Sequence, residues 1–424
     1  MPSAAPVPRG PSVLALGSAA ELLTRPGCPV CRYTAEASDR YLAWFALEAH
    51  ADPVTITRWC ASLGTCAMHT RRLMGQPGAA ARLTAGYRYV LQAARAQLAG
   101  RTAPLATCPV CEHDEAAASR TLEVLLDGLG QTGVQGRYLE LGGMCVPHIR
   151  AACSVRGRRP TATWVVQSMD ATTADHRCNL DVLAGGPDYD ADERARLRAA
   201  LPSEGSLPAG TCPVCLAAAH AELAGLRLAA ETGGGRWAEG AAGDVSDQGL
   251  SLCPGHLRDA AQLGGGGRVT ALLAWQADRQ AADLAGLVRL SARWRAGRGG
   301  WMRGGHSPAL ADRCPVCLVR QRAAGQELQR HRDMPQAMPV PGGARALCVH
   351  HVLALRAADP VSARAAAAAA AEYADTLIKE LTEAFRKNTW AFRHESRGPE
   401  ATTWRWAAAF LDGAVFGGGP PEQP

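Results

Sequence analysis

Aromatic residues are scarce in this chain of 424 residues, at 5% of the sequence, although hydrophobic residues as a whole reach 47%. At about 100–200 residues per domain, the length predicts two to four units. A core built largely from alanine and other small side chains buries less apolar surface per residue than an aromatic core. We therefore expect a further interaction to contribute to the stability of the fold.

Lysine is nearly missing. Lys379 and Lys387 are the only two lysines among 45 basic residues, and the other basic residues are arginines. This bias fits a GC-rich coding sequence better than a surface selected to bind nucleic acid. The formal net charge of +6 therefore does not by itself indicate a nucleic-acid partner.

Long apolar runs are also missing. No stretch of about 18 apolar residues is present, so we predict no membrane-spanning helix and no membrane partner. Residues 1–20 lack the basic start and continuous apolar region of a secretory signal and are expected to be a flexible N-terminus. These features favour a cytoplasmic location, where thiols stay reduced. The 15 cysteines should then be ligands or core residues before they are disulfides.

The cysteines form a repeat. The tetrapeptide Cys-Pro-Val-Cys (CPVC) occurs four times, and a Cys-x-x-His pair (CxxH) follows each copy before the next begins. Chance predicts about 0.4 CxxH pairs for this composition, against four in the sequence. Three cysteines remain outside the pattern: Cys60, Cys153 and Cys178. The predicted metal ligands are Cys28, Cys31, Cys66 and His69 in repeat 1, Cys108, Cys111, Cys145 and His148 in repeat 2, Cys212, Cys215, Cys253 and His256 in repeat 3, and Cys314, Cys317, Cys348 and His351 in repeat 4.

Three thiolates and one imidazole complete a tetrahedral shell for Zn²⁺, so the sequence predicts four structural zinc ions per chain, one held by each repeat. Such sites can add about 10 kcal/mol or more of apparent folding free energy. An iron–sulfur cluster and dithiol redox chemistry at CPVC are the less favoured alternatives. Four protein ligands leave no open position for a catalytic zinc. His350 could replace His351, and Cys60 could compete in repeat 1, but both are expected to be spectators.

The fold class is predicted to be all-α, with four zinc-linked helical repeats, because helical periodicity follows each motif and alternating strand patterns are scarce. In repeat 2, Leu122, Leu125, Leu126 and Leu129 mark one helix face. Gly- and Pro-rich linkers suggest that the repeats form two pairs, 1+2 and 3+4. The predicted divisions are a flexible N-terminus (1–20), repeat 1 (21–103), repeat 2 (104–186), a linker (187–210), repeat 3 (211–295), a linker (296–311), repeat 4 (312–388) and a C-terminal extension (389–424).

Two segments are candidate interaction surfaces. The strip from Arg289 to Arg303 contains Arg293, Trp294, Arg295 and Trp301, and this mixture suits single-stranded nucleic acid. The C-terminal extension concentrates aromatic residues that could dock a protein partner, and its candidate residues are Trp390, Arg393, Glu395, Trp404 and Arg405. Metal binding weakens the first possibility. Twelve thiols lose protons as four divalent ions arrive, which reduces the formal charge from +6 to +2.

Repeat 1 resembles a group of bacterial proteins of uncharacterised activity whose repeats read CPxC, an aromatic helix, a turn of small residues and CxxH. The C-terminal extension resembles the closing segment of that group. The matching residues, in order, are Lys387, Trp390, Phe392, Arg393, Glu395, Gly398 and Trp404. The resemblance implies metal-binding helical repeats and no particular activity. Repeat 3 departs from the pattern with a Gly-rich loop before Cys253.

No Gly-rich phosphate loop between a strand and a helix and no GxSxG motif occur in the sequence, and we predict no catalytic residue. The favoured function is a zinc-binding scaffold or adaptor that interacts with a protein partner. One alternative is a metal- or Fe–S-dependent redox or biosynthetic accessory enzyme. Another is a nucleic-acid-binding regulator that uses the arginine-rich strip.

Overall fold

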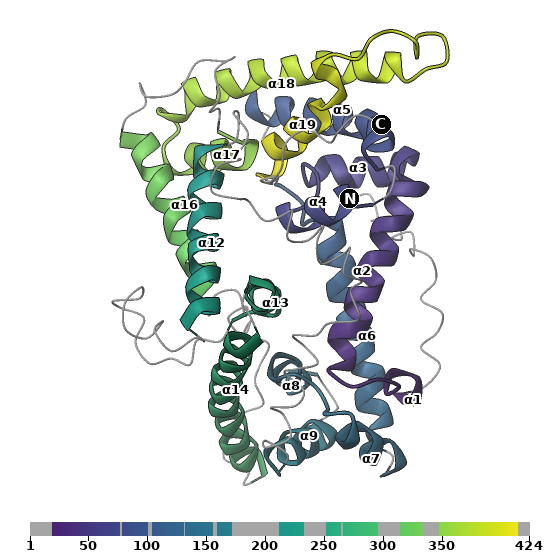
Figure 1. The fold of residues 1–424 in the computed structure, drawn as a ribbon, viewed down its shortest axis with the longest axis vertical. Helices are drawn as coiled ribbons and strands as arrows, with labels where there is room; N and C mark the ends of the chain where they lie inside the picture. The colour runs from purple at the N-terminus through teal and green to yellow at the C-terminus, as the bar shows by residue number, and fades with distance from the viewer. Residues whose placement is uncertain are drawn as a thin grey trace, which may run out of the picture. The chain divides into compact units, whose positions relative to one another are not determined.

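A computed structural model describes residues 19–76, 79–100, 104–130, 132–155, 159–171, 212–232, 252–263, 266–295, 314–333 and 347–413. These residues form helices and turns without a strand, so the all-α prediction is confirmed (Figure 1). None of the described helices combines the length and the apolar character needed to cross a bilayer. The helices are α1 (Ala19–Leu22), α2 (Pro29–Leu47), η1 (Ala49–Ala51), α3 (Pro53–Ala61), α4 (Ala67–Met74), α5 (Ala79–Leu98), α6 (Pro109–Gly128), α7 (Thr132–Glu140), α8 (Val146–Ala152), α9 (Arg159–Ala171), α12 (Pro213–Thr232), α13 (Pro254–Leu263), α14 (Gly266–Arg295), α16 (Pro315–Asp333), α17 (Val349–Ala358), α18 (Ala363–Lys387), η4 (Pro399–Ala401) and α19 (Thr403–Asp412).

Every motif opens a helix. The CPVC motifs begin α2, α6, α12 and α16, with proline as the first helical residue, where its fixed φ suits the helix and its missing N–H costs nothing. The CxxH motifs begin the short helices α4, α8, α13 and α17. A further helix follows each of them, namely α5, α9, α14 and α18. The helical periodicity that the sequence predicts after each motif is thus confirmed, whereas the additional helices α3 and α7 of repeats 1 and 2 were not predicted.

The chain divides into two compact units whose residues do not follow the order of the repeats. The first comprises residues 1–44, 113–188 and 228–314, and the second comprises residues 45–112, 189–227 and 315–424. Helices α2, α6 and α12 contribute residues to both units.

Aliphatic side chains from α6 to α9 form the core of the first compact unit. The predicted leucine face of α6 is buried there, and Tyr138 and Ile149 are fully buried beside it. Helix α14 packs against α8 and α9 and adds Leu284 and Leu287 to the same core.

Helix α18 packs along α5 in the second compact unit (Figure 1). An ion pair of 2.8 Å between Arg95 Nε and Asp375 Oδ1 joins the two helices. Trp59 of α3 lies between Phe45 and Tyr87, with ring centroids 5.0 and 4.9 Å away. These three rings thus form an aromatic cluster at the contact between α3 and α5.

Candidate metal centres

All sixteen predicted ligands come together in four groups, each with three cysteines and one histidine whose ligand atoms lie within 4.8 Å of one another. We name each group after its first residue. The Cys28 site contains Cys28, Cys31, Cys145 and His148; the Cys66 site contains Cys66, His69, Cys108 and Cys111; the Cys212 site contains Cys212, Cys215, Cys348 and His351; and the Cys253 site contains Cys253, His256, Cys314 and Cys317.

The expectation that each repeat holds its own metal is wrong. The Cys28 site joins the CPVC motif of repeat 1 to the CxxH pair of repeat 2, and the Cys66 site makes the reciprocal connection. Repeats 3 and 4 exchange their motifs in the same manner at the Cys212 and Cys253 sites. The predicted arrangement of the repeats in two pairs, 1+2 and 3+4, agrees with this exchange.

Helix length explains the exchange. Helix α2 has 19 residues and α6 has 20, so each carries the chain about 28–30 Å from its own CPVC motif. The following residues fold into further helices, α3 and α7, instead of forming an extended return loop. The CxxH pair therefore completes a site with a CPVC motif other than its own.

Each site lies where two helices begin. In a CPVC motif, the first cysteine precedes the proline at N1, and the second cysteine lies within the first turn of the helix. In CxxH pairs such as Cys66–His69, the cysteine is the N-cap and the histidine lies in the first turn. Backbone hydrogen bonds from Thr70 N to Cys66 O and from Arg32 N to Cys28 O close these turns. The positive end of each helix dipole favours the thiolate form that binds metal.

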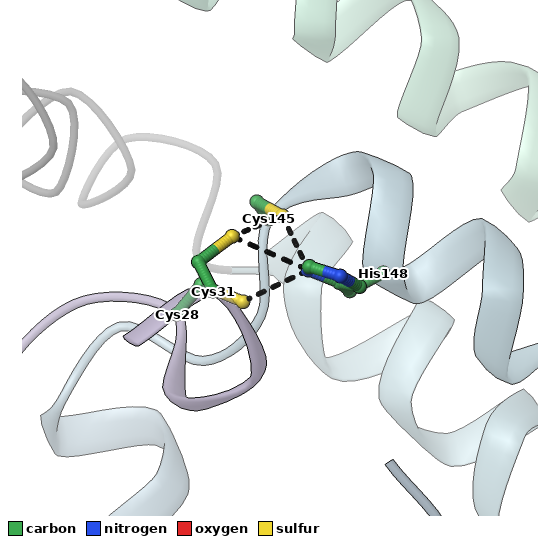
Figure 2. Close-up of side chains that lie close together, drawn as sticks. All are labelled: Cys28, Cys31, Cys145 and His148. Carbon is green, nitrogen blue, oxygen red and sulfur yellow. Dashed lines mark hydrogen bonds between the residues drawn. The ribbon is translucent and has the colours of Figure 1, made fainter. Parts of the chain in front are cut away.

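The Cys28 site shows the geometry in detail (Figure 2). His148 Nδ1 lies 3.3 Å from Cys28 Sγ, 3.4 Å from Cys31 Sγ and 3.1 Å from Cys145 Sγ. Cys31 Sγ and Cys145 Sγ are 3.6 Å apart. One tetrahedral ion with Zn–S near 2.3 Å and Zn–N near 2.0 Å would separate its ligands by about 3.8 Å for S···S and about 3.5 Å for S···N. The observed spacing fits such an ion.

The other sites repeat this geometry. In the Cys66 site, Cys66 Sγ lies 3.8 Å from Cys111 Sγ and 3.3 Å from His69 Nδ1. In the Cys212 site, Cys215 Sγ lies 3.6 Å from Cys348 Sγ. In the Cys253 site, His256 Nδ1 lies 3.3 Å from the sulfurs of both Cys253 and Cys314. The histidine presents Nδ1 to the sulfurs in all four sites.

The charges at the Cys28 site favour a cation. Burial raises the pKa of Cys28. Hydrogen bonds from Cys145 and Cys31 and the charge of His148 lower this pKa by more than burial raises it, so the pKa lies well below its usual value. Burial lowers the pKa of His148, but the Cys28 thiolate and the neighbouring sulfurs raise it to about 11. The thiols thus stabilise a negative charge beside a positive imidazole, and a metal ion can replace that imidazole proton.

Matching turns position two of the CxxH pairs. Gly64 N donates to Trp59 O at 2.8 Å, and Gly143 N donates to Tyr138 O at 2.9 Å, which ends α3 and α7 in the same manner. Each glycine has a positive φ and stands two residues before the ligating cysteine. In sequence terms, this turn is marked by an aromatic residue seven positions and a glycine two positions before the cysteine, a signal that the CPVC and CxxH motifs do not include.

His350 and Cys60, the two residues predicted to be spectators, take no part in the four groups of the described chain. His350 Nδ1 donates to the carbonyl oxygen of Leu411 at 2.5 Å, while His351 joins the Cys212 site. Burial raises the pKa of Cys60 to about 11, and Cys60 belongs to no site. Cys153 is buried in the core of the first compact unit. Cys178 lies outside the described residues.

The structure describes the predicted interaction residues of the C-terminal extension but not the side chains of the arginine-rich strip. Arg393 lies over the Trp390 ring at 3.3 Å, while Glu395 pairs with Arg386. Trp404 and Arg405 lie in α19 and are half-buried. Arg293, Trp294 and Arg295 fall in the last turn of α14, where the side chains are outside the description, and Trp301 lies outside the described residues.

No family model matches this chain, and no curated protein or solved structure matches it either.

Proposed function

We propose that this protein binds four structural zinc ions and serves as a scaffold for a protein partner. The observation that carries the proposal is the fourfold recurrence of three sulfurs and one Nδ1 at the spacing of a single tetrahedral ion. Four protein ligands close the shell of such an ion, which is the arrangement of structural rather than catalytic zinc. Each ion would fasten the starts of two helices together.

The spacing also favours one ion over an iron–sulfur cluster. In a four-iron cluster each cysteine binds a different iron atom, which sets the cysteine sulfurs farther apart than ligands that share one ion. Sγ···Sγ distances of 3.6–3.8 Å suit a shared ion. Native mass spectrometry and elemental analysis of purified protein should find four zinc ions and a colourless solution. Iron with visible absorbance, or clearly fewer than four ions, would contradict the zinc proposal.

The scaffold role is supported by an exposed surface formed by the end of α18 and the start of the C-terminal extension. The Trp390 side chain is 75% exposed, and Phe385 and Phe392 are 47% and 39% exposed. Arg393 and Arg386 lie over aromatic rings of this surface. Glu383 and Glu395 lie among these cations, and such mixed charge suits a protein partner better than the uniformly basic groove expected for nucleic acid.

A matched pair of variants tests the surface. We expect Trp390→Ala to reduce capture of a specific partner and to leave zinc content unchanged. Val361→Ala is the control, because Val361 is 72% exposed and precedes α18, away in sequence from the extension. Equal capture by both variants and the wild type would contradict a partner surface at Trp390. Salt-sensitive binding to single-stranded nucleic acid that requires Trp390 would favour the regulator instead.

A further inference from the structure

The last turn of α19 connects two of the metal sites in the second compact unit. The Thr70 hydroxyl donates to the Asp412 carboxylate, and Thr70 directly follows the Cys66-site ligand His69. One residue earlier on α19, the Leu411 carbonyl accepts from His350, which directly precedes the Cys212-site ligand His351. One short turn of helix is therefore bonded to a neighbour of a ligand in each site.

Gly413 brings this turn against the metal ligands themselves. Its N–H donates to Ala409 O at 3.0 Å, and its φ of 72° ends the helix in a left-handed conformation. A Cβ atom at this position would overlap Cys215 Sγ and would lie 3.7 Å from Cys348 Sγ. Two requirements, the positive φ and the space beside the sulfur, thus restrict position 413 to glycine.

The rest of α19 is firmly packed. Phe410 is buried and meets Tyr373 edge to face at 5.1 Å, and the Thr403 hydroxyl donates to Glu380 at 2.6 Å. The helix packs against α4 and α5 of repeat 1 and against α17 and α18 of repeat 4. Because α19 is bonded beside both sites, a movement at one site shifts α19 and thereby affects the other site.

We infer that α19 is a clasp that couples metal binding at the Cys66 site to metal binding at the Cys212 site. The inference rests on the proposal that these sites hold metal. An emptied site loses the ion that draws its sulfurs together, and its helix starts then relax. Relaxation displaces Thr70 at one site or Cys215 at the other and weakens the docking of α19. Because both sites gain stability from the docked helix, the loss of one ion lowers the affinity for the other.

Cysteine alkylation read by mass spectrometry can resolve the sites during a chelator titration of the full-length zinc-loaded protein. Cys348→Ser impairs the Cys212 site. We expect Cys66, Cys108 and Cys111 then to become reactive at about tenfold lower chelator concentration. Cys145→Ser, which impairs the Cys28 site in the first compact unit, is the control and should leave those three cysteines unchanged. Equal protection of the Cys66 site in wild type and Cys348→Ser would overturn the clasp.

A second pair of variants keeps every ligand. Gly413→Ala should expose the cysteines of both the Cys66 and Cys212 sites at lower chelator concentration, while those of the Cys28 site stay protected. Gly325→Ala is the control, because a Cβ there has no atom within 4 Å and the position is helical. Gly413→Ala indistinguishable from Gly325→Ala would overturn the clasp. Wild-type cysteines that react without chelator would instead contradict the proposed metal binding itself.

Discussion

Cys31 Sγ lies 3.6 Å from Cys145 Sγ, although 114 residues separate them in the chain. Cys31 belongs to the CPVC motif of repeat 1, and Cys145 belongs to the CxxH pair of repeat 2. The other motif of each of these two repeats forms the Cys66 site. Neither repeat of the pair can therefore complete a four-ligand site alone. The pair of repeats, rather than the single repeat, is the smallest part of the chain that can hold metal in this arrangement.

Metal counts in double variants distinguish exchanged sites from sites within one repeat. Cys31→Ser should reduce the zinc content from four ions to three. Adding Cys145→Ser should leave it at three, because both residues belong to the Cys28 site. Adding Cys66→Ser to Cys31→Ser should reduce it to two. Native mass spectrometry gives the counts and circular dichroism checks the fold; three ions in Cys31→Ser/Cys66→Ser and two in Cys31→Ser/Cys145→Ser would restore the within-repeat pairing.

Gly143 gives a test of the turn that positions Cys145. Its φ is +70°, and a Cβ would lie 2.7 Å from Met169 Sδ and 2.9 Å from Tyr138 Cζ. Gly64 also has a positive φ, of +107°, but a Cβ there would make only an ordinary contact with Trp59 Nε1 at 3.7 Å. We expect Gly64→Ala to cost about 1–2 kcal/mol from backbone strain, and Gly143→Ala about 2–4 kcal/mol from strain and overpacking together.

Urea denaturation at saturating zinc measures both changes. Gly136→Ala serves as the control, because the residue lies within α7 and a Cβ there meets nothing within 4 Å. It should leave stability unchanged or raise it by about 0.5–1 kcal/mol through helix propensity. If Gly143→Ala cost no more than Gly64→Ala, the packing of Met169 and Tyr138 would not be what makes Gly143 necessary.

The cysteines and histidines that form the four groups, and the helices that follow the motifs, were predictable from the sequence because both depend on local features. Proline and cysteine in CPVC mark a helix start, and the spacing of Leu122 to Leu129 marks a buried face. These features need only a few neighbouring residues, and the structure contains the corresponding helices and the buried face.

The pairing of the motifs was not predictable in the same manner. Four identical CPVC motifs can combine with any of four CxxH pairs, and composition does not distinguish the combinations. The choice depends on where the rigid helices α2 and α6 carry the chain. The same holds for Asp412, which meets Thr70 across 342 residues and belongs to no motif. Phe385 of α18 is likewise 47% exposed beside Arg88, although its apolar character alone would predict a place in the core.

Glu400 provides a test of the C-terminal extension. Its side chain is 8% exposed, and its Oε1 accepts from Lys387 Nζ at 2.8 Å and from Gly398 N at 2.7 Å. Burial raises the pKa of this carboxyl, but these hydrogen bonds outweigh burial and hold it below the usual value. Glu400→Gln should therefore destabilise the protein at neutral pH by about 1.5–3 kcal/mol, the value of a hydrogen bond to a charged group.

Glu395→Gln is the matched control for that change, since the Glu395 side chain is 37% exposed and its partner Arg386 keeps the Glu383 carboxylate in the variant. Denaturation midpoints of the two variants can be compared under the same zinc concentration. Adding Lys387→Met to Glu400→Gln should recover part of the loss, because it removes a largely buried charge that keeps only the Glu383 carboxylate, 3.7 Å away, as an ionic partner. Equal midpoints for Glu400→Gln and Glu395→Gln would show that the Lys387–Glu400 pair contributes no more than the exposed one.

The two described cysteines outside the sites, the half-buried Cys60 and the buried Cys153, should behave as ordinary thiols that bind no metal. Burial raises the pKa of Cys60 to about 11, and burial also raises that of Cys153 to about 11. Cys60→Ala/Cys153→Ala should therefore keep four zinc ions. A thiol whose pKa is raised by folding keeps its proton in the folded state while the unfolded chain loses it. Wild-type stability should thus fall relative to the double variant as the pH rises from about 8.5 towards 11. Denaturation at pH 7.5 and pH 9.5 measures this difference, and a stability gap that does not change with pH would contradict the raised pKa values.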